Sequence, residues 1–367
     1  MIVRERSCEM GERGKVKILF WWVVILACGI TFPACMKMDR SKFKPPKITM
    51  VVPNNLHSVA AVDANNIWIF GNYGTIIHTC DAGKTWEKQE SGYEGVLPKA
   101  QFLDANRGWV CGTEGTILYT TDGGKHWVRS KTGTEKYIVD ISIVDEKYGF
   151  AAGESMTMLK SVDGGKNWES MIKEENKQDI HLSGVYFVDS LCGWVVGEFS
   201  TILHTTDGGK TWKNQECQDL IPKVDETQWE EQMPGLLNVY FVDRDRGWIQ
   251  GMDGVTIMTE NGGETWKKLS LATDHSLYNM QIIGKKGWMV GDKGAYLTTE
   301  DGGKTWKYQD EVIKTRFWLR DLSFSDPNTG WVVGYRGTIA KTQDMGKTFT
   351  MVSGLSYDMP EFGITDF

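Results

Sequence analysis

The sequence has few of the residues that build metal centres, redox sites and disulfide frameworks. Its 367 residues include seven cysteines and six histidines, and no Cys-x-x-Cys pair occurs. The cysteine spacing does not repeat, so no metal or redox motif is indicated. His78 and His204 stand at equivalent positions of an internal repeat, which is typical of strand side chains rather than of ligands. We therefore expect no metal site, no cofactor and no disulfide.

Enzyme motifs are missing as well. Although the chain holds 41 glycines, it has no Gly-x-Ser-x-Gly nucleophile motif and no phosphate-binding loop. A glycosidase of the usual kind needs two carboxylates that face each other. Asp140 and Asp321 are candidates, but no spacing marks them as a pair. We expect no catalytic residues and no enzymatic activity.

An excess of positive charge is also missing. The formal net charge is −7 at pH 7, from 41 basic and 48 acidic residues. Removal of residues 1–27, which hold five basic and three acidic groups, would make it −9. Because an acidic domain repels the phosphate backbone, nucleic acid is not expected as a partner.

Long apolar runs are absent except near the N-terminus, where one extends over Ile18–Ala27. It is too short to span a membrane comfortably, since a spanning helix needs about 20 residues. A basic stretch precedes it, with Arg4, Arg6, Arg13, Lys15 and Lys17. This arrangement is typical of an export signal. We predict that residues 1–27 are a signal segment and that the protein is exported to a periplasmic or lumenal side.

Two cysteines follow small residues close to the end of this segment. Cys28 follows Ile-Leu-Ala, and Cys35 follows Phe-Pro-Ala. Both contexts resemble a bacterial lipoprotein box, in which the cysteine carries the lipid. Cys28 fits the length of the apolar run better and is the predicted lipidation site, with Cys35 as the alternative. Residues 28–46 would then form a tether, whereas ordinary signal cleavage or an uncleaved anchor are the other readings.

What the chain does contain is seven copies of one short motif, Thr/Ser-x-Asp-x-Gly-x-x-Trp. The copies begin at residues 79, 120, 161, 205, 259, 299 and 342, at intervals of 41, 41, 44, 54, 40 and 43 residues. A period of about 40 with strand-like content is typical of propellers and repeat arrays. The acidic position is occupied by Asp81, Asp122, Asp163, Asp207, Asn261, Asp301 and Asp344.

Each unit also carries an aromatic residue three places before a glycine, as in Trp194 and Gly197. Together with an upstream apolar run, this divides each unit into four short strands bounded by Gly, Asp or Asn. Four-stranded units at this period are blades, and seven blades close a ring. We predict an all-β, seven-bladed propeller over residues 47–355, with a tail over residues 356–367. Either Lys47–Val52 or Thr348–Val352 could supply the outermost strand of the last blade.

The repeated motif resembles the Asp box of sialidase-type propellers, and its chemistry is local. The carboxylate accepts N–H groups in a tight turn, the glycine supplies a positive φ, and the tryptophan buries an apolar plate between sheets. Because catalysis needs one site and the motif recurs in every unit, we predict a structural role for all seven positions. Asn261 keeps the hydrogen-bonding shape, and Phe349 keeps the plate.

Residues that break the repeat are the candidates for function. Trp229 and Trp318 are the only tryptophans outside the repeat and the signal segment. Both lie in stretches that connect an outer strand to the next inner strand, so we expect them on the ring face opposite the Asp-box turns. The predicted partner-binding residues are Trp229, Arg316, Phe317, Trp318, Arg320 and Arg336, because aromatic and arginine anchors dominate protein interfaces. In the structural alternative, Trp229 folds onto its own loop and Trp318 wedges the channel mouth.

Longer stretches of the repeat are more specific than the Asp box alone. Phe241-Val-Asp-x-x-x-Gly-Trp248 and Gly193-Trp-Val-Val-Gly-x-x-x-Thr-Ile-Leu-His-Thr-Thr-Asp-Gly-Gly-Lys-Thr-Trp212 resemble the photosystem II stability/assembly factor family. The resemblance covers about residues 47–355. It implies an exported, often lipid-anchored propeller without enzymatic activity. Such a protein binds a membrane-protein subunit during complex assembly, in association with an arginine-rich patch.

We therefore predict a monomeric, non-catalytic scaffold that is tethered to the membrane and binds a membrane-protein or exported-complex subunit. The alternative is a carbohydrate-binding or carbohydrate-active propeller, because Asp boxes also occur in sialidases and xyloglucanases. Sialidases need an arginine triad and an Arg-Ile-Pro signature, which this chain lacks. A lectin, however, could use Trp229 as an aromatic platform.

Overall fold

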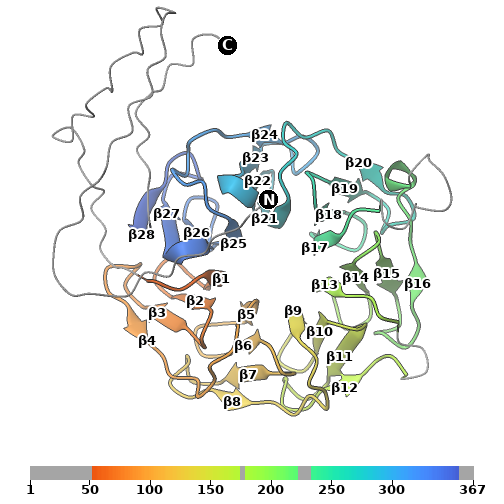
Figure 1. Cartoon of the computed structure of the whole chain (residues 1–367), viewed down its shortest axis with the longest axis horizontal. Coiled ribbons are helices and arrows are strands. Elements are labelled where there is room, and N and C mark those ends of the chain that lie inside the picture. The colour runs from red at the N-terminus through yellow and green to blue at the C-terminus, as the bar shows by residue number, and fades with distance from the viewer. Residues whose placement is uncertain (1–51, 174–177, 222–232, 355–367) are drawn as a thin grey trace, which may run out of the picture. The chain divides into compact units, whose positions relative to one another are not determined.

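The computed structural model describes residues 52–173, 178–221 and 233–354, all of which belong to one compact unit, residues 46–367. They form seven antiparallel sheets of four strands each, arranged as a ring (Figure 1). Residues from the innermost strands of all seven sheets line a central channel. Every sheet consists of four consecutive strands, ordered from the channel outwards. The seven-bladed propeller predicted from the repeat is therefore confirmed.

The strands have short and regular bounds. The innermost strands are β1 (Leu56–Ala61), β5 (Ala100–Phe102), β9 (Ile138–Ile143), β13 (Leu182–Phe187), β17 (Leu236–Phe241), β21 (Leu277–Ile283) and β25 (Leu319–Phe324). The second strands are β2 (Ile67–Gly71), β6 (Gly108–Cys111), β10 (Gly149–Gly153), β14 (Gly193–Gly197), β18 (Gly247–Gly251), β22 (Lys286–Gly291) and β26 (Gly330–Gly334). The third strands are β3 (Ile76–Thr79), β7 (Ile117–Thr120), β11 (Thr157–Ser161), β15 (Ile202–Thr205), β19 (Thr256–Thr259), β23 (Tyr296–Thr299) and β27 (Thr338–Thr342). The outermost strands are β4 (Glu87–Lys88), β8 (Val128–Arg129), β12 (Glu169–Ser170), β16 (Lys213–Asn214), β20 (Lys267–Lys268), β24 (Lys307–Tyr308) and β28 (Thr350–Ser353).

The second strand of each blade forms the centre of the core. All its residues are buried in blades such as the fourth, where β14 reads Gly-Trp-Val-Val-Gly. The ring of Trp194 stacks on Phe241 of the next blade, with a centroid distance of 3.5 Å. The repeated aromatic position thus packs one sheet against its neighbour, and a buried side chain of this size stabilises the fold by about 2–3 kcal/mol.

The Asp-box turns share one hydrogen-bond pattern. In the first turn, the Thr79 hydroxyl donates to Asp81 (2.8 Å) and accepts the N–H of Gly83 (2.9 Å). The Asp81 carboxylate also accepts the N–H of Thr85 at 2.9 Å. Equivalent bonds occur in the other six turns. The six carboxylates and the Asn261 side-chain amide are therefore occupied by bonds within their own turns.

The ring closes between blades seven and one without sharing a strand. The outermost strand of blade seven is β28 (Thr350–Ser353), which overlaps the predicted alternative Thr348–Val352. Val52, the one described residue of the other alternative, lies outside any strand. Instead, the segment Val52–Asn55 lies against blade seven. The N–H of Val52 donates to the Ser353 hydroxyl at 3.1 Å, and Val52 packs into an apolar cluster with Trp331. Among the described residues, closure is thus held by non-covalent contacts.

The innermost strands are joined by bonds from side chains to backbone. The Asp140 carboxylate accepts the N–H of Val185 in the next blade at 2.8 Å, and Asp321 accepts that of Val59 at 2.9 Å. Gln101 bonds both the N–H and the carbonyl of Ile143. Such bonds satisfy strand-edge groups that would otherwise lie unpaired beside the channel. Both candidate acids of a carboxylate pair are thus engaged with backbone.

Asp140 gives the folding stability a characteristic pH dependence. Burial raises the pKa of Asp140 to about 6, and the positive charge of Lys99 offsets only part of that effect. Because the folded state then holds this proton more tightly than the unfolded state, the contribution of Asp140 to stability grows as the pH falls from about 7 to 4. Hydrogen bonds within the turns lower the pKa of Asp207 and Asp301 to about 2, so their contributions are lost as the pH falls below about 4.

We therefore expect Asp140→Asn to be more stable than the wild type at pH 7, by up to about 3 kcal/mol, and to lose this advantage near pH 4. Burial lowers the pKa of His57 and of His204, and both act in the opposite direction between pH 7 and 5. The quantity to measure is therefore the difference between the variant and the wild type in urea unfolding. A difference that stays constant from pH 7 to 4 would contradict the expectation.

Candidate functional site

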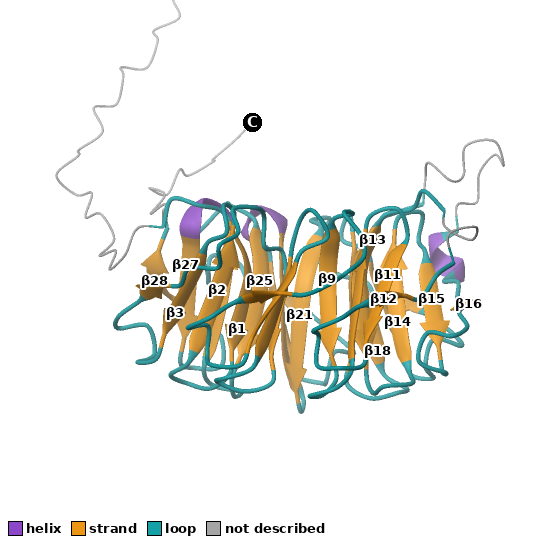
Figure 2. Ribbon diagram, turned by 90° about the horizontal axis from the view of Figure 1, so that it is seen from below, coloured by secondary structure: helices purple, strands orange, loops and turns teal. Residues whose placement is uncertain are grey.

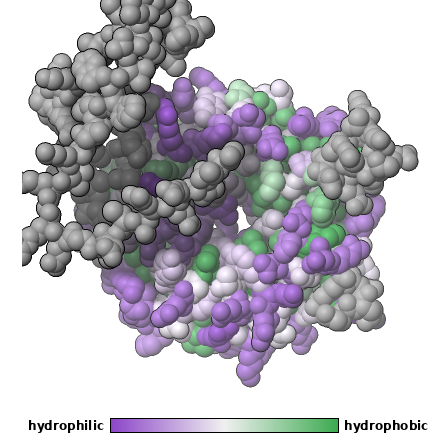
Figure 3. All heavy atoms as spheres, viewed as in Figure 1, coloured by the Kyte–Doolittle hydropathy of each residue, from purple (hydrophilic) through white to green (hydrophobic). Residues whose placement is uncertain are grey.

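The two faces of the ring differ in the segments that they carry. The turns between second and third strands lie on the same face as the connections from one blade to the next, and we call this the loop face. Its helical segments, η3 (Gln218–Leu220), η4 (Asp292–Gly294) and η5 (Tyr335–Gly337), lie along the upper side of the ring in Figure 2. The Asp-box turns lie on the opposite face, because they join the third strand to the fourth. Viewed along the ring axis, the surface is mainly hydrophilic, with apolar side chains in small separate patches (Figure 3).

On the loop face, aromatic and arginine side chains meet where blade six joins blade seven. The ring of Tyr335 lies 5.9 Å from that of Phe317 and 6.0 Å from that of Trp318. The Arg336 guanidinium stands over the Phe317 ring at 4.9 Å. The connection before β25 and the turn after β26 thus form one surface.

Blade six extends this surface towards the channel. The ring of Tyr278 lies 6.4 Å from that of Trp318, and the Arg320 guanidinium stands over Tyr278 at 4.4 Å. We call the whole set the aromatic–arginine cluster: Tyr278, Phe317, Trp318, Arg320, Tyr335 and Arg336. Cation–π contacts of this kind contribute about 0.5–1 kcal/mol at exposed sites. They hold the guanidinium groups while leaving N–H donors available to a ligand.

The cluster is unusually exposed for its composition. Trp318 keeps 49% of its surface accessible and Tyr335 keeps 37%, whereas the repeat tryptophan Trp331 of the same blade is fully buried. An exposed aromatic patch beside arginine is the composition that anchors protein interfaces. The surface can therefore stack against apolar or planar groups of a ligand and donate hydrogen bonds to its carbonyl or carboxylate oxygens.

The turn that presents Tyr335 and Arg336 is locally constrained. Arg336 has a φ of 53° and Gly337 a φ of 68°, both in the left-handed region. A Cβ atom at Gly337 would lie 1.7 Å from the carbonyl oxygen of Val52, so only glycine fits there. The N–H of Arg336 donates to the Asn55 side chain at 3.1 Å. The segment that closes the ring thus also supports the cluster.

The structure brings together four of the six predicted partner-binding residues: Phe317, Trp318, Arg320 and Arg336. Trp229 lies outside the described residues, so its predicted place on the face opposite the Asp-box turns stays a prediction. Sequence reasoning missed Tyr278 and Tyr335. Both are neighbours of repeat residues and carry no signal of their own, although Tyr335 directly precedes Arg336 in the turn.

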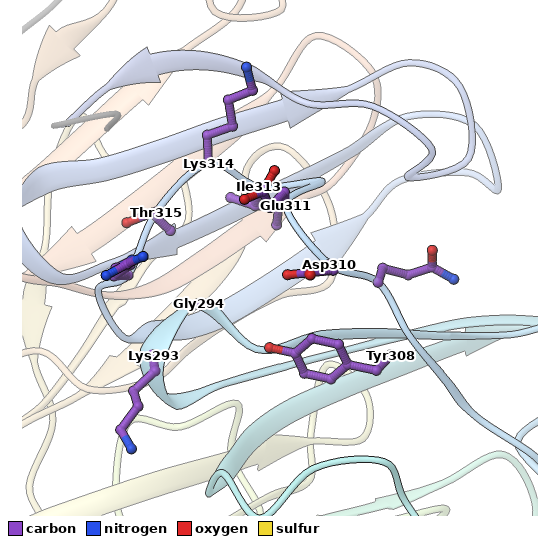
Figure 4. A pocket seen from close by; sticks show the side chains of 10 residues that line it. Lys293, Gly294, Tyr308, Asp310, Glu311, Ile313, Lys314 and Thr315 are labelled. Carbon is purple, nitrogen blue, oxygen red and sulfur yellow. The ribbon is translucent and has the colours of Figure 1, made fainter. Parts of the chain in front are cut away.

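Arg316 lies beside the cluster, in a groove between η4 and the connection that follows β24. The groove has a volume of about 230 Å³ and is lined mostly by polar side chains, among them Lys293, Tyr308, Asp310 and Arg316. Lys293 and Lys314 stand on opposite sides of it, with Asp310 and Tyr308 between them (Figure 4). An extended segment bound to the cluster could therefore continue into a polar groove that offers both signs of charge.

The channel mouth next to the cluster is a separate cavity of about 130 Å³. Arg320 and His57 line it together with Lys99, whose ammonium group lies 3.1 Å from the Asp321 carboxylate. Trp318 is not among its lining residues. In this structure Trp318 contacts Tyr278 and Tyr335 instead of filling the channel mouth.

The described residues contain no group of three or more His, Cys, Asp and Glu side chains that could hold a metal ion. The four described cysteines, Cys80, Cys111, Cys192 and Cys217, are free thiols. Within the described part of the chain, no helix has the length and apolar character needed to cross a membrane.

Comparison with known sequences points to one family. The family model described as photosynthesis system II assembly factor YCF48 matches residues 4–118, 126–227 and 221–312. The photosystem II assembly protein Ycf48 of Thermosynechococcus vestitus is 36% identical over 67 residues, which are 17% of this chain and 19% of the relative. The alignment to this relative thus spans only about a fifth of its length.

Solved structures share the fold. A YCF48 protein bound to D1 peptide matches with a TM-score of 0.63 and 21% identity, over 82% of this chain and 95% of that one. YCF48 from Cyanidioschyzon merolae gives 0.62 and 18%, over 82% and 99%. A GH74 xyloglucanase from Xanthomonas campestris gives 0.62 and 10%, over 82% of this chain but only 53% of the enzyme. At these identities the likeness shows the propeller fold alone.

Proposed function

Because the chain belongs to the family of the photosynthesis system II assembly factor YCF48, we propose that it is a non-catalytic propeller that binds a photosystem II subunit during assembly. The observation that carries this proposal is the aromatic–arginine cluster on the loop face, where Trp318 and Tyr335 stay exposed beside Arg336. A family member has been solved with D1 peptide bound, so a peptide segment of such a subunit is the proposed ligand.

The geometry of the cluster suits an extended peptide. The rings of Phe317, Trp318 and Tyr335 offer apolar surface, and the guanidinium groups of Arg320 and Arg336 offer paired N–H donors that match carboxylate oxygens. Charge-assisted hydrogen bonds of this kind contribute about 1.5–3 kcal/mol each when they are shielded from water. Arg316 in the adjoining groove is proposed to bind the same partner, as is Trp229.

The carbohydrate alternative draws its support from the shared propeller fold and from the Asp boxes, with Trp229 as a candidate aromatic platform. Its motif-based case rests on the Asp boxes, whose carboxylates bond within their own turns. The acids of the inner ring, Asp140 and Asp321, bond to the backbone of neighbouring blades. We therefore favour the binding protein over a glycoside hydrolase.

The proposal is tested by titration of the purified full chain, in detergent, with synthetic peptides from the exported-side segments of D1. Calorimetry should give saturable binding of one peptide per chain, weakened by salt because arginines take part. Scrambled peptides are the control for sequence, and xyloglucan oligosaccharides are the control for the alternative. Hydrolysis of the oligosaccharides, or binding of them but of no D1 peptide, would reject the proposal. Light scattering on the same samples tests the proposed monomeric state.

We further propose export, with residues 1–27 as signal, a lipid tether over residues 28–46, the propeller over 47–355 and a tail over 356–367. Cys28, or else Cys35, is the proposed lipidation site; both lie outside the described residues. Cys28→Ser and Cys35→Ser are each to be followed by labelled fatty-acid incorporation and by membrane fractionation. One of the two variants should lose the label and move to the soluble fraction, and full labelling of both would contradict the proposed tether.

A further inference from the structure

Large apolar side chains are exposed mainly on the loop face. Among the described residues, eight such side chains are exposed, and five of them belong to this face: Tyr73, Phe199, Met252, Trp318 and Tyr335. Tyr73 is the most accessible of all, with 74% of its surface exposed, and it lies in the second-to-third-strand turn of blade one. Its ring does not stack on any ring of the aromatic–arginine cluster, so the cluster does not account for its exposure.

Charge divides the same face into two parts. The turns between second and third strands in blades two to five each carry one acid and no base: Glu114, Glu154, Glu198 and Asp253. The turns of blades six and seven carry Lys293 and Arg336, and Lys314 and Arg316 are exposed in the connection between them. Acids are present on this side too, namely Asp292, Asp310 and Glu311, but bases outnumber them at blades six and seven, whereas Glu90 and the exposed Glu94 follow blade one. The arc of blades six and seven is therefore aromatic and basic. The second-to-third-strand turns of blades two to five form an acidic arc, although Lys131 and Lys136 lie in the connection between blades two and three.

The N-terminal segment joins the propeller at the edge of the aromatic and basic arc, between blades seven and one. Asn55 lies between the turns of blades one and seven, because its carbonyl accepts the N–H of Asn72 at 3.0 Å and its side chain accepts that of Arg336. Fifty-one residues precede Val52, and they include the apolar run Ile18–Ala27. A tether held at a membrane would therefore enter the propeller at this edge of the ring.

We propose that Tyr73, Lys293, Lys314 and Arg316 form a membrane-contact rim that rests on an anionic lipid surface. The four exposed residues flank the aromatic–arginine cluster, with Tyr73 on the blade-one side and the three bases on the blade-six side. Tyrosine suits the boundary between headgroups and acyl chains, since its ring is apolar and its hydroxyl stays wet. The basic side chains on the blade-six side are attracted by anionic headgroups, and the acidic arc is repelled by them.

This inference rests on the proposed membrane tether but not on the identity of the protein partner. With the rim on the lipid, the cluster between its two parts would lie at the level where exported segments of a membrane protein emerge. The acidic arc of blades two to five would be tilted away. The same contact thus orients the binding site.

The test is hydroxyl-radical footprinting of the full chain in three states: in detergent, on neutral phosphatidylcholine vesicles, and on vesicles with phosphatidylglycerol added. On the anionic vesicles we expect oxidation of Tyr73 to fall several-fold relative to detergent. Phe199 on the acidic arc and Val162 in an Asp-box turn, which are both exposed, should be oxidised equally in all three states. The vesicles contain no protein, so failure of this experiment and failure of the D1-peptide titration are independent.

A charge-reversal pair supplies the matched variants. The triple change Lys293→Glu, Lys314→Glu and Arg316→Glu should abolish the protection of Tyr73 on anionic vesicles, while the melting temperature stays close to that of the wild type. The control is the triple change Lys84→Glu, Lys166→Glu and Lys210→Glu, which alters the net charge equally but on the Asp-box face. In this control Tyr73 should remain protected on anionic vesicles. Equal oxidation of Tyr73 in detergent and on anionic vesicles would overturn the proposal. So would equal protection of Phe199 and Tyr73, or a full chain that does not associate with the vesicles.

Discussion

Replacing Asp321 by alanine is expected to lower the free energy of unfolding by about 3 kcal/mol, the lower end of the range for breaking a buried ion pair, because the Lys99 side chain stays 28% exposed. The carboxylate is 2% exposed. It accepts bonds from the Ser58 hydroxyl (2.8 Å), the Val59 N–H (2.9 Å) and the Lys99 ammonium (3.1 Å). The side chain of Asn279 donates to it as well. Its loss leaves Lys99 without its acid and removes acceptors at the one junction where the chain does not continue from blade to blade.

Asp140→Ala is the matched control, because Asp140 occupies the same place in blade three and also accepts a backbone N–H of the next blade. The structure gives Asp140 no ion pair, and burial already disfavours its charge. Its removal should cost less than about 2 kcal/mol. Urea unfolding at pH 7 measures both variants. If Asp321→Ala costs no more than Asp140→Ala, the ion-pair network does not hold the ring closed.

Replacing Trp318 by alanine is expected to weaken the proposed binding of D1 peptides by at least about 2 kcal/mol, roughly 30-fold in Kd. Trp318 is the most exposed aromatic side chain of the cluster and contacts both Tyr278 and Tyr335. Because 49% of its surface is accessible, truncation creates no core cavity, and the melting temperature should change little. Calorimetric titration and thermal unfolding of the same preparation measure the two quantities.

Phe199→Ala provides the comparison for this experiment. Phe199 is 46% exposed and lies on the same face, in the turn of blade four, away from the cluster. It should bind the peptide as the wild type does. Equal loss of affinity in both variants would show that the binding site is not confined to the cluster but extends over the loop face. A large fall in melting temperature for Trp318→Ala, with binding retained by the folded fraction, would show a structural role instead.

Aligning the seven repeat units of the sequence identifies the residues that depart from the repeat pattern. Trp318 stands out because the repeat assigns it no task, and that signal led to Phe317, Arg320 and Arg336 as well. Tyr278 gave no such signal, since an aromatic residue on an inner strand is ordinary. Its proximity to Trp318 depends on how blade six is placed beside blade seven, which no local pattern encodes.

The sequence by itself determined the blade count, the four strands of each blade and the class of the fold. These properties follow from interactions between residues close in the chain, repeated seven times: the alternation of strands, the Asp-box turns and the buried aromatic position. A pattern that recurs seven times outweighs local ambiguity, which is why Asn261 and Phe349 did not obscure it.

Only the tertiary structure decided how the ring closes and which residues share a surface. The Asp321 carboxylate bonds to residues more than 200 positions away, such as Lys99 and Val59, and the Arg336 turn rests on Asn55. Such contacts form because seven twisted sheets return the last blade to the first, so they depend on the sum of all blade-to-blade rotations. That sum is a property of the packed ring. The residues that it brings into contact are not distinguished by any pattern in their local sequence.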